Sequence, residues 1–185
     1  GGLFDTDPGQ LADNLGDAVD PGEQRRLRGW RHATAAAFKV DLAVRGGVPW
    51  AAEGARRAGT LHLGGTFGEV AASEAASSGG RMPERPYVLV SQPAVADPSR
   101  RVGDVEPVWA YAHVPGGDAA PDPTVARSAI LGELERAAPG LAARTAPTHV
   151  PPPANLPADH PNPVRGAITR GEPTPRPRPP RPPLP

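Results

Sequence analysis

The sequence predicts an α+β domain, with a mixed or antiparallel sheet that carries helices on one face, followed by a disordered proline-rich tail. Segments typical of strands and helices follow one another in the order strand, strand, helix, strand, strand, helix over residues 37–138. Proline is uneven, with 12 residues in 1–145 and 15 in 146–185. The 22 glycines and 27 prolines among 185 residues reach the level at which low-complexity sequence is expected.

The composition excludes several classes of protein. The absence of cysteine rules out a disulfide scaffold, a thiolate metal site and a cysteine nucleophile. The 20 Lys+Arg are balanced by 20 Asp+Glu, so we expect no nucleic-acid partner, which normally requires a basic excess. The sequence has no apolar run of membrane-spanning length and no secretory signal pattern at its start, so we expect no membrane span and a cytoplasmic location.

The first elements are a weakly helical region and a clear strand. Residues 9–29 are polar with weak helical spacing, and Pro21 stands where the first turn of a helix would begin. Residues 37–45 alternate strictly, which predicts a half-buried strand. One side of that strand is apolar and the other holds Lys39 and Asp41; the apolar positions are Phe38, Val40, Leu42 and Val44.

The next pair of elements is a short strand and a capped helix. Residues 59–65 form the strand, which ends on a glycine pair. Thr66 then occupies an N-cap position with Glu69 three residues later, the pattern of a capping box. We therefore expect a helix over 67–77 that stops before Gly79.

Two further strands and a helix complete the domain. The strands cover 86–92 and 106–114. The helix covers 123–138, with its apolar positions at Val125, Ala129, Ile130 and Leu134. We place the ordered domain at 1–145 and the Pro/Arg-rich tail at 146–185, since a proline-dense segment can neither join a sheet nor continue a helix.

The motifs for ligand chemistry are sparse. The glycines of 64–68 follow a strand and open a helix, as phosphate loops do, but they lack the GxGxxG spacing, which favours a simple turn and cap. No histidine pair has the spacing of a helical metal site, so we expect no metal. His62 and His113 lie on predicted strands and could face one pocket. No serine lies in a GxSxG elbow.

Lys39 and the tryptophans each have two interpretations. Lys39, the only lysine, either forms a solvated ion pair with Asp41 or lines a pocket, where its amine could stabilise the anionic ring of a redox cofactor. Trp50 is expected to be a core or sheet-surface anchor. Trp109 and Tyr111 share one strand face, and that face would suit either a hydrophobic substrate or a packed helix.

A series of short segments resembles one enzyme family. The segments are FKVDLA at 38–43, VPW at 48–50, AGTLHLGGT at 58–66 with Glu69 and Glu74 after it, GRMPERPYVLV at 80–90, DPSR at 97–100 and VWAYAHVP at 108–115. In this order and at these separations they resemble the middle part of bacterial phytoene dehydrogenase-like, NAD(P)/FAD-dependent oxidoreductases. The resemblance covers roughly residues 25–145.

The resemblance implies that the chain is a fragment of an FAD-dependent oxidoreductase. This part would belong to the substrate domain, whose sheet covers the reactive side of the flavin. The complete enzyme would transfer a hydride from a small apolar, isoprenoid-like substrate to FAD, with desaturation as the expected outcome. The dinucleotide fingerprint of the family is missing, so we expect no cofactor-binding residues in this chain and weak or no FAD binding by the chain alone.

The candidate pocket residues are Lys39, His62, Trp109 and His113, and no catalytic residue can be transferred from the family. Two alternatives stay open. The chain could be an inactive truncated product, as a change of reading frame near residues 146–170 would generate. It could also be a non-enzymatic α+β module whose proline-rich tail binds a partner, although a linker role for the tail is favoured.

Overall fold

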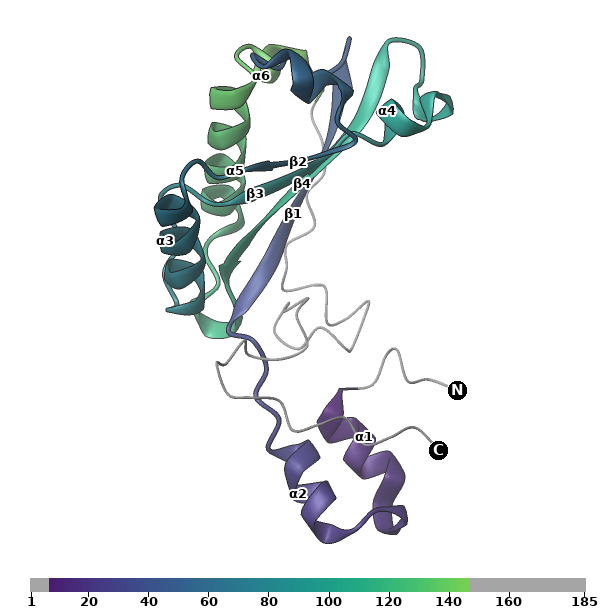
Figure 1. Cartoon of the computed structure of the whole chain (residues 1–185), viewed down its shortest axis with the longest axis vertical. Coiled ribbons are helices and arrows are strands. Elements are labelled where there is room, and N and C mark those ends of the chain that lie inside the picture. The colour runs from purple at the N-terminus through teal and green to yellow at the C-terminus, as the bar shows by residue number, and fades with distance from the viewer. Residues whose placement is uncertain (1–6, 147–185) are drawn as a thin grey trace.

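The computed structural model describes residues 7–146 and shows an α+β fold with a five-stranded sheet in the order β2-β3-β4-β1-β5 (Figure 1). Every neighbouring pair of strands is antiparallel. The strands are β1 (Ala35–Arg45), β2 (Thr60–Leu63), β3 (Val88–Ser91), β4 (Val105–Pro115) and β5 (Thr145–Ala146). The prediction for the proline-rich tail falls almost entirely on residues 147–185, outside the described part.

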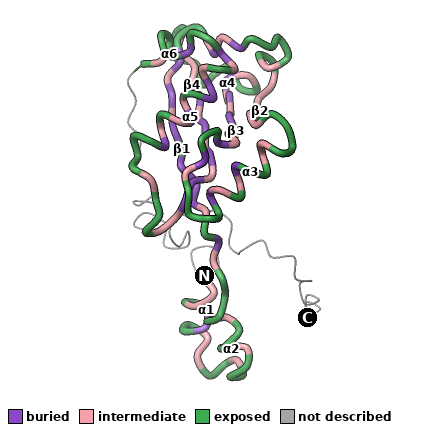
Figure 2. Tube along the Cα trace, turned by 90° about the vertical axis from the view of Figure 1, so that its left-hand side faces the viewer, coloured by how far each residue is buried: buried purple, intermediate pink, exposed green. Residues whose placement is uncertain are grey.

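The two longest helices of the described residues lie on one side of the sheet, as predicted, whereas the short helix between β3 and β4 lies on the other side of the strands in Figure 1. Helix α5 covers one face, and α3 lies beside it (Figure 1). The shorter α1 and α2 form a pair that lies away from the sheet in both views (Figures 1 and 2). The helices are α1 (Pro8–Leu15), α2 (Pro21–Arg28), α3 (Phe67–Ser78), α4 (Pro93–Ala96), α5 (Pro123–Ala137) and α6 (Leu141–Arg144).

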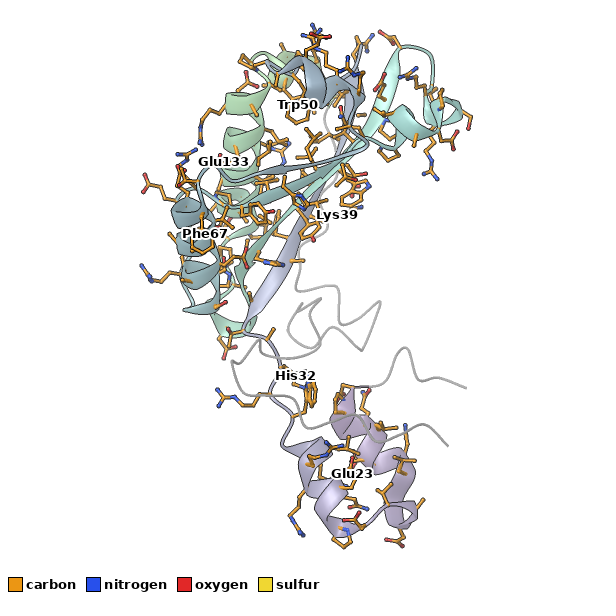
Figure 3. All side chains as sticks on the ribbon, in the orientation of Figure 1. Glu23, His32, Lys39, Trp50, Phe67 and Glu133 are labelled. Carbon is orange, nitrogen blue, oxygen red and sulfur yellow. The ribbon has the colours of Figure 1, made fainter. Side chains whose placement is uncertain are left out.

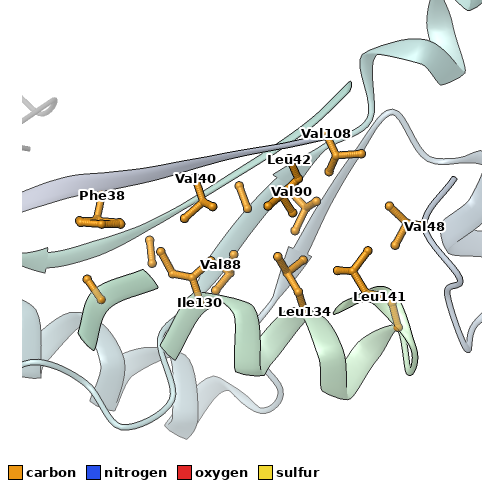
Figure 4. Close-up of a cluster of buried hydrophobic side chains, with 14 of the residues drawn as sticks. Phe38, Val40, Leu42, Val48, Val88, Val90, Val108, Ile130, Leu134 and Leu141 are labelled. Atoms are coloured by element: carbon orange, nitrogen blue, oxygen red, sulfur yellow. The ribbon is translucent and has the colours of Figure 1, made fainter. Parts of the chain in front are cut away.

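The two longest strands of the sheet, β1 and β4, pair with each other. The two strands pair over their whole length, from Ala35 opposite Pro115 to Arg45 opposite Val105. The predicted alternation is confirmed by β1, in which buried residues alternate with more exposed ones from Phe38 to Arg45, as expected when successive side chains point to opposite faces. The core-facing residues of these strands and β3 are buried against α5 (Figure 4); they are Phe38, Val40, Leu42, Val44, Val88, Val90, Val108, Ala110, Ala112 and Val114.

The core-facing stripe of α5 includes some, but not all, of the apolar positions named for the expected helix. Ala126, Ile130 and Leu134 are fully buried, whereas Val125 is 52 % exposed. Positions four residues apart lie on one face of a helix, and a residue one position away is rotated by about 100°. Val125, one of the apolar positions of the expected helix, therefore lies outside the buried stripe.

The predicted helix starts are confirmed by their caps. Asp20 caps α2, with Pro21 in the first turn. The Thr66 hydroxyl accepts from the Glu69 backbone N–H at 3.3 Å, and Glu69 Oε2 accepts from the Thr66 backbone N–H at 2.7 Å. Both halves of the capping box at the start of α3 are therefore formed.

The C-terminal edge of the described fold was not predicted as an element. After α5 the chain turns at Gly140, which has φ +88°, forms α6 and adds β5 against β1. The Glu135 carboxylate fixes this turn by accepting from the backbone N–H groups of Gly140 at 2.6 Å and Ala142 at 2.9 Å. These N–H donors hold the pKa of Glu135 below its ordinary value, with Ala142 the larger cause.

Candidate functional site

The sheet face opposite α5 presents aromatic and polar side chains. Figure 3 shows Lys39 on this side of the sheet, away from Glu133 of α5. The strand register places one row of side chains across four strands, because His62 lies opposite Leu89, Leu89 opposite Tyr111, and Tyr111 opposite Lys39. We call the sheet face that carries this row the open face. It is formed by the alternate residues of each strand that do not point into the core.

A small hollow lies on the open face where β2, β3 and β4 meet. Its lining residues are His62, Tyr87, Leu89, Tyr111 and His113, and its volume is about 40 Å³. The His62 ring stacks on Tyr87 with centroids 5.4 Å apart. The Tyr111 and His113 rings are 6.0 Å apart. A hollow of this size accepts one small group, since pockets that enclose a whole ligand measure hundreds of Å³.

Helix α3 fixes the histidine at one end of the hollow. His113 Nδ1 lies 2.8 Å from Glu74 Oε2, and the Ser77 hydroxyl donates to the His113 backbone carbonyl at 2.8 Å. These contacts form where the pairing of β3 with β4 has ended, at Ala112. The other oxygen of Glu74, Oε1, is buried and accepts no hydrogen bond from any group within residues 7–146.

Lys39 and Trp109 lie beside the hollow on the same face. Lys39 Nζ is 2.6 Å from Asp41 Oδ1 and 5.8 Å from the centre of the Trp109 ring. Trp109 stacks with Tyr111 at a centroid distance of 6.3 Å. The two charged side chains are about half exposed, so their pairing contributes little to stability. Trp109 and Tyr111 therefore form an aromatic strip, and the Lys39 ammonium group lies at its edge. Such a surface suits a flat or apolar molecule.

The structure brings the four predicted pocket residues to one face of the sheet. His62 and His113 line the same hollow, as their strand positions allowed. Lys39 and Trp109 flank it without lining it. Trp50 lies elsewhere: its side chain is buried in the core, and its Nε1 donates to Gln92 Oε1 at 2.8 Å.

Some residues of the site were missed by the sequence analysis. Tyr87 and Leu89 could have been found, because alternation along the predicted strand 86–92 places them on one face. Tyr111 was assigned to the face of Trp109 but not to a pocket. Glu74 gave no signal, because its contact with His113 joins residues 39 positions apart.

The glycine turn before α3 does not fit a phosphate group. A Cβ at Gly64 would overlap the Tyr87 ring and lie 2.8 Å from Val70 Cγ2. Two backbone N–H groups at the helix start are already used, that of Glu69 by the Thr66 hydroxyl and that of Thr66 by the Glu69 carboxylate. The N–H and hydroxyl of Thr66, followed by the charge of Arg85, hold the pKa of Glu69 below its ordinary value. An ionised carboxylate at this position would repel a pyrophosphate, so the turn-and-cap interpretation is the better one.

Within the described range 7–146, no group of three or more His, Asp or Glu side chains is arranged to hold a metal ion. No helix in the same range is long and apolar enough to cross a membrane. Comparison with protein-family models gives no match to this chain, and comparison with curated proteins gives none either.

Proposed function

We propose that the described domain is the substrate domain of an FAD-dependent oxidoreductase of the phytoene dehydrogenase-like type, in which the open face lies against the flavin ring and its apolar substrate. The observation that carries the proposal is the open face itself, where Trp109 and Tyr111 stack beside the single lysine, Lys39. A bound flavin would supply hydride transfer, and the protein would supply orientation and electrostatics.

The two halves of FAD differ in how well the described residues suit them. The ring half matches the aromatic strip, with Lys39 available to an anionic ring. The nucleotide half is poorly matched by the start of α3, because the Glu69 carboxylate occupies that position and accepts from the Thr66 N–H, while the Glu69 N–H is bound by the Thr66 hydroxyl. We therefore propose that the pyrophosphate is held by a part of the protein other than residues 7–146.

The coding DNA on both sides of this chain gives a test that does not depend on affinity. The proposal expects a GxGxxG-encoding segment upstream and a glycine-rich FAD segment downstream, in the same or another reading frame. Flanking DNA that encodes neither segment would overturn the proposal.

A second test uses the chain as it is. The ¹⁵N-labelled chain is titrated with riboflavin, which carries the flavin ring without the pyrophosphate, and amide and indole shifts are followed by NMR. We expect saturable shifts at Trp109, Tyr111 and Lys39, and roughly threefold weaker binding in Lys39→Met. Arg45→Met, at the far end of the same strand face, should leave the affinity unchanged. Shifts confined to other parts of the chain would contradict the proposal.

A further inference from the structure

We infer that the hollow on the open face is a binding site for an apolar alcohol, in which Nε2 of His113, held in place by Glu74, accepts the hydrogen bond of the hydroxyl group. This inference concerns the chain's own ligand in the absence of a flavin, because a flavin ring and the body of this ligand would use the same surface of Trp109 and Tyr111. It is carried by the hydrogen-bonding of His113, by the lining of the hollow and by its size.

The hydrogen-bonding of His113 selects one ring nitrogen for a ligand. Nδ1 is 2.8 Å from Glu74 Oε2, and we assign Nδ1 as the donor of this hydrogen bond, because carboxylate oxygens act as acceptors. In the neutral ring Nε2 is then an acceptor. His113 itself lines the hollow, and since Nδ1 is bound to Glu74, we assign Nε2 as the ring atom that meets a hydrogen-bond donor there.

The surroundings of His113 select a neutral ligand. The other groups of the hollow are the two tyrosine rings, Leu89 and His62, and Lys39 lies next to Tyr111 in the register. An anion would approach the charge of Glu74, whose Oε1 is already buried without a donor from residues 7–146. An ammonium group would lose its hydration among aromatic rings, with Lys39 nearby. A hydroxyl group meets neither penalty.

The size of the hollow implies that the hydroxyl group and the apolar body of the ligand lie at different places on the open face. A volume of about 40 Å³ admits a hydroxyl head but not a whole organic molecule. The aromatic strip of Trp109 and Tyr111 adjoins the hollow, because Tyr111 belongs to both. We therefore place the hydroxyl in the hollow and the apolar body over the strip.

The test uses the full chain with two matched probes, benzyl alcohol and benzyl methyl ether, which differ chiefly in the hydroxyl donor. Long-range ¹H–¹⁵N spectra at about pH 8.5, where imidazole side chains are neutral, report which ring nitrogen carries the proton. We expect His113 to be protonated at Nδ1. Benzyl alcohol should shift its Nε2 signal and bind roughly fivefold more tightly than the ether.

Variants at Glu74 test the positioning role separately. Glu74→Ala should shift His113 toward the Nε2-protonated form and remove the preference for the alcohol. Glu74→Gln should retain both, since its amide oxygen can still accept from Nδ1. Glu84→Ala, at an exposed carboxylate in the loop before β3, is the control and should behave as wild type. A proton on Nε2 in the wild-type chain, or equal binding of alcohol and ether, would overturn the inference.

Discussion

Gly64 shows how a single residue supports the open face. Its Cα lies so close to Tyr87 that any side chain would collide with that ring. Tyr87 in turn stacks on His62 and lines the hollow, and its backbone N–H donates to the Ser73 hydroxyl of α3 at 2.9 Å. The absence of a side chain at Gly64 therefore allows β2, β3 and α3 to meet at one point.

Gly64→Ala should lower the free energy of unfolding by roughly 1–3 kcal/mol, because the added methyl group forces Tyr87 and Val70 to move. Urea unfolding measures this loss, and the ring signals of His62 and His113 should shift as Tyr87 is displaced. Gly59→Ala is the matched control, since a Cβ at Gly59 meets nothing within 4 Å. Equal stability of the two variants would show that Tyr87 is not tightly held.

At the scale of elements, α5 stabilises the sheet through one stripe of side chains. Ile130 and Leu134 are fully buried against the apolar face of β1, β3 and β4. The side chain of Glu133, also on α5, is only 6 % exposed. It pairs with two partly exposed cations, Arg85 and Arg136. This buried carboxylate is therefore compensated by two cations and is tolerated at the edge of the core.

Ile130→Ala should cost about 2–5 kcal/mol of unfolding free energy, because it leaves a cavity in a fully packed region. Val125→Ala, on the same helix but 52 % exposed, should change stability by less than about 0.5 kcal/mol. Chemical denaturation of both variants tests whether Ile130, and not Val125, belongs to the stripe that packs on the sheet. A larger loss at Val125 than at Ile130 would contradict the observed packing.

The turn from α5 to α6 gives a prediction on pH. The pKa of Glu135 is lowered in the folded chain by the N–H groups of Ala142 and Gly140. A lowered pKa means that this stabilisation is complete above the unfolded value near 4.5 and is lost as the pH falls through the folded pKa. Glu135→Gln should therefore be less stable than wild type at neutral pH, and the difference should narrow as the pH falls below 4.5 and close below the lowered pKa of the folded chain.

Urea midpoints measured from neutral to acid pH test this expectation for Glu135. Glu84→Gln serves as the control, since Glu84 is an exposed loop residue, and it should keep the wild-type dependence on pH. A constant difference between Glu135→Gln and wild type at every pH would show that the ionised carboxylate has no special role in the turn.

At the scale of the whole molecule, burial is concentrated in the sheet and its helix layer. Figure 2 shows buried residues along the strands, whereas α1 and α2 are mostly intermediate or exposed. In these two helices only Ala12 is buried. Their stability therefore rests on their caps and on each other, and hardly on the core.

Hydrogen exchange should reflect this division of the molecule. We expect the amides of α1 and α2 to exchange much faster than those of β1 and β4, because local opening of the helix pair exposes little apolar surface. Mass spectrometry of peptides from the two regions measures the ratio. Protection of α1 and α2 equal to that of β1 would mean that the helix pair unfolds only together with the sheet.

The sequence by itself determined the order of β1 to β4, α3 and α5, the two faces of each long strand and the capping of α3. These features depend on residues close together in the chain, such as the alternation from Phe38 to Val44 and the Thr66–Glu69 box. Only the tertiary structure decided which strands are neighbours, and therefore that His62 and His113 share a hollow and that Glu74 orients His113. Alternation tells which side of a strand a residue occupies, but the partner across the sheet depends on long-range pairing that no local pattern encodes.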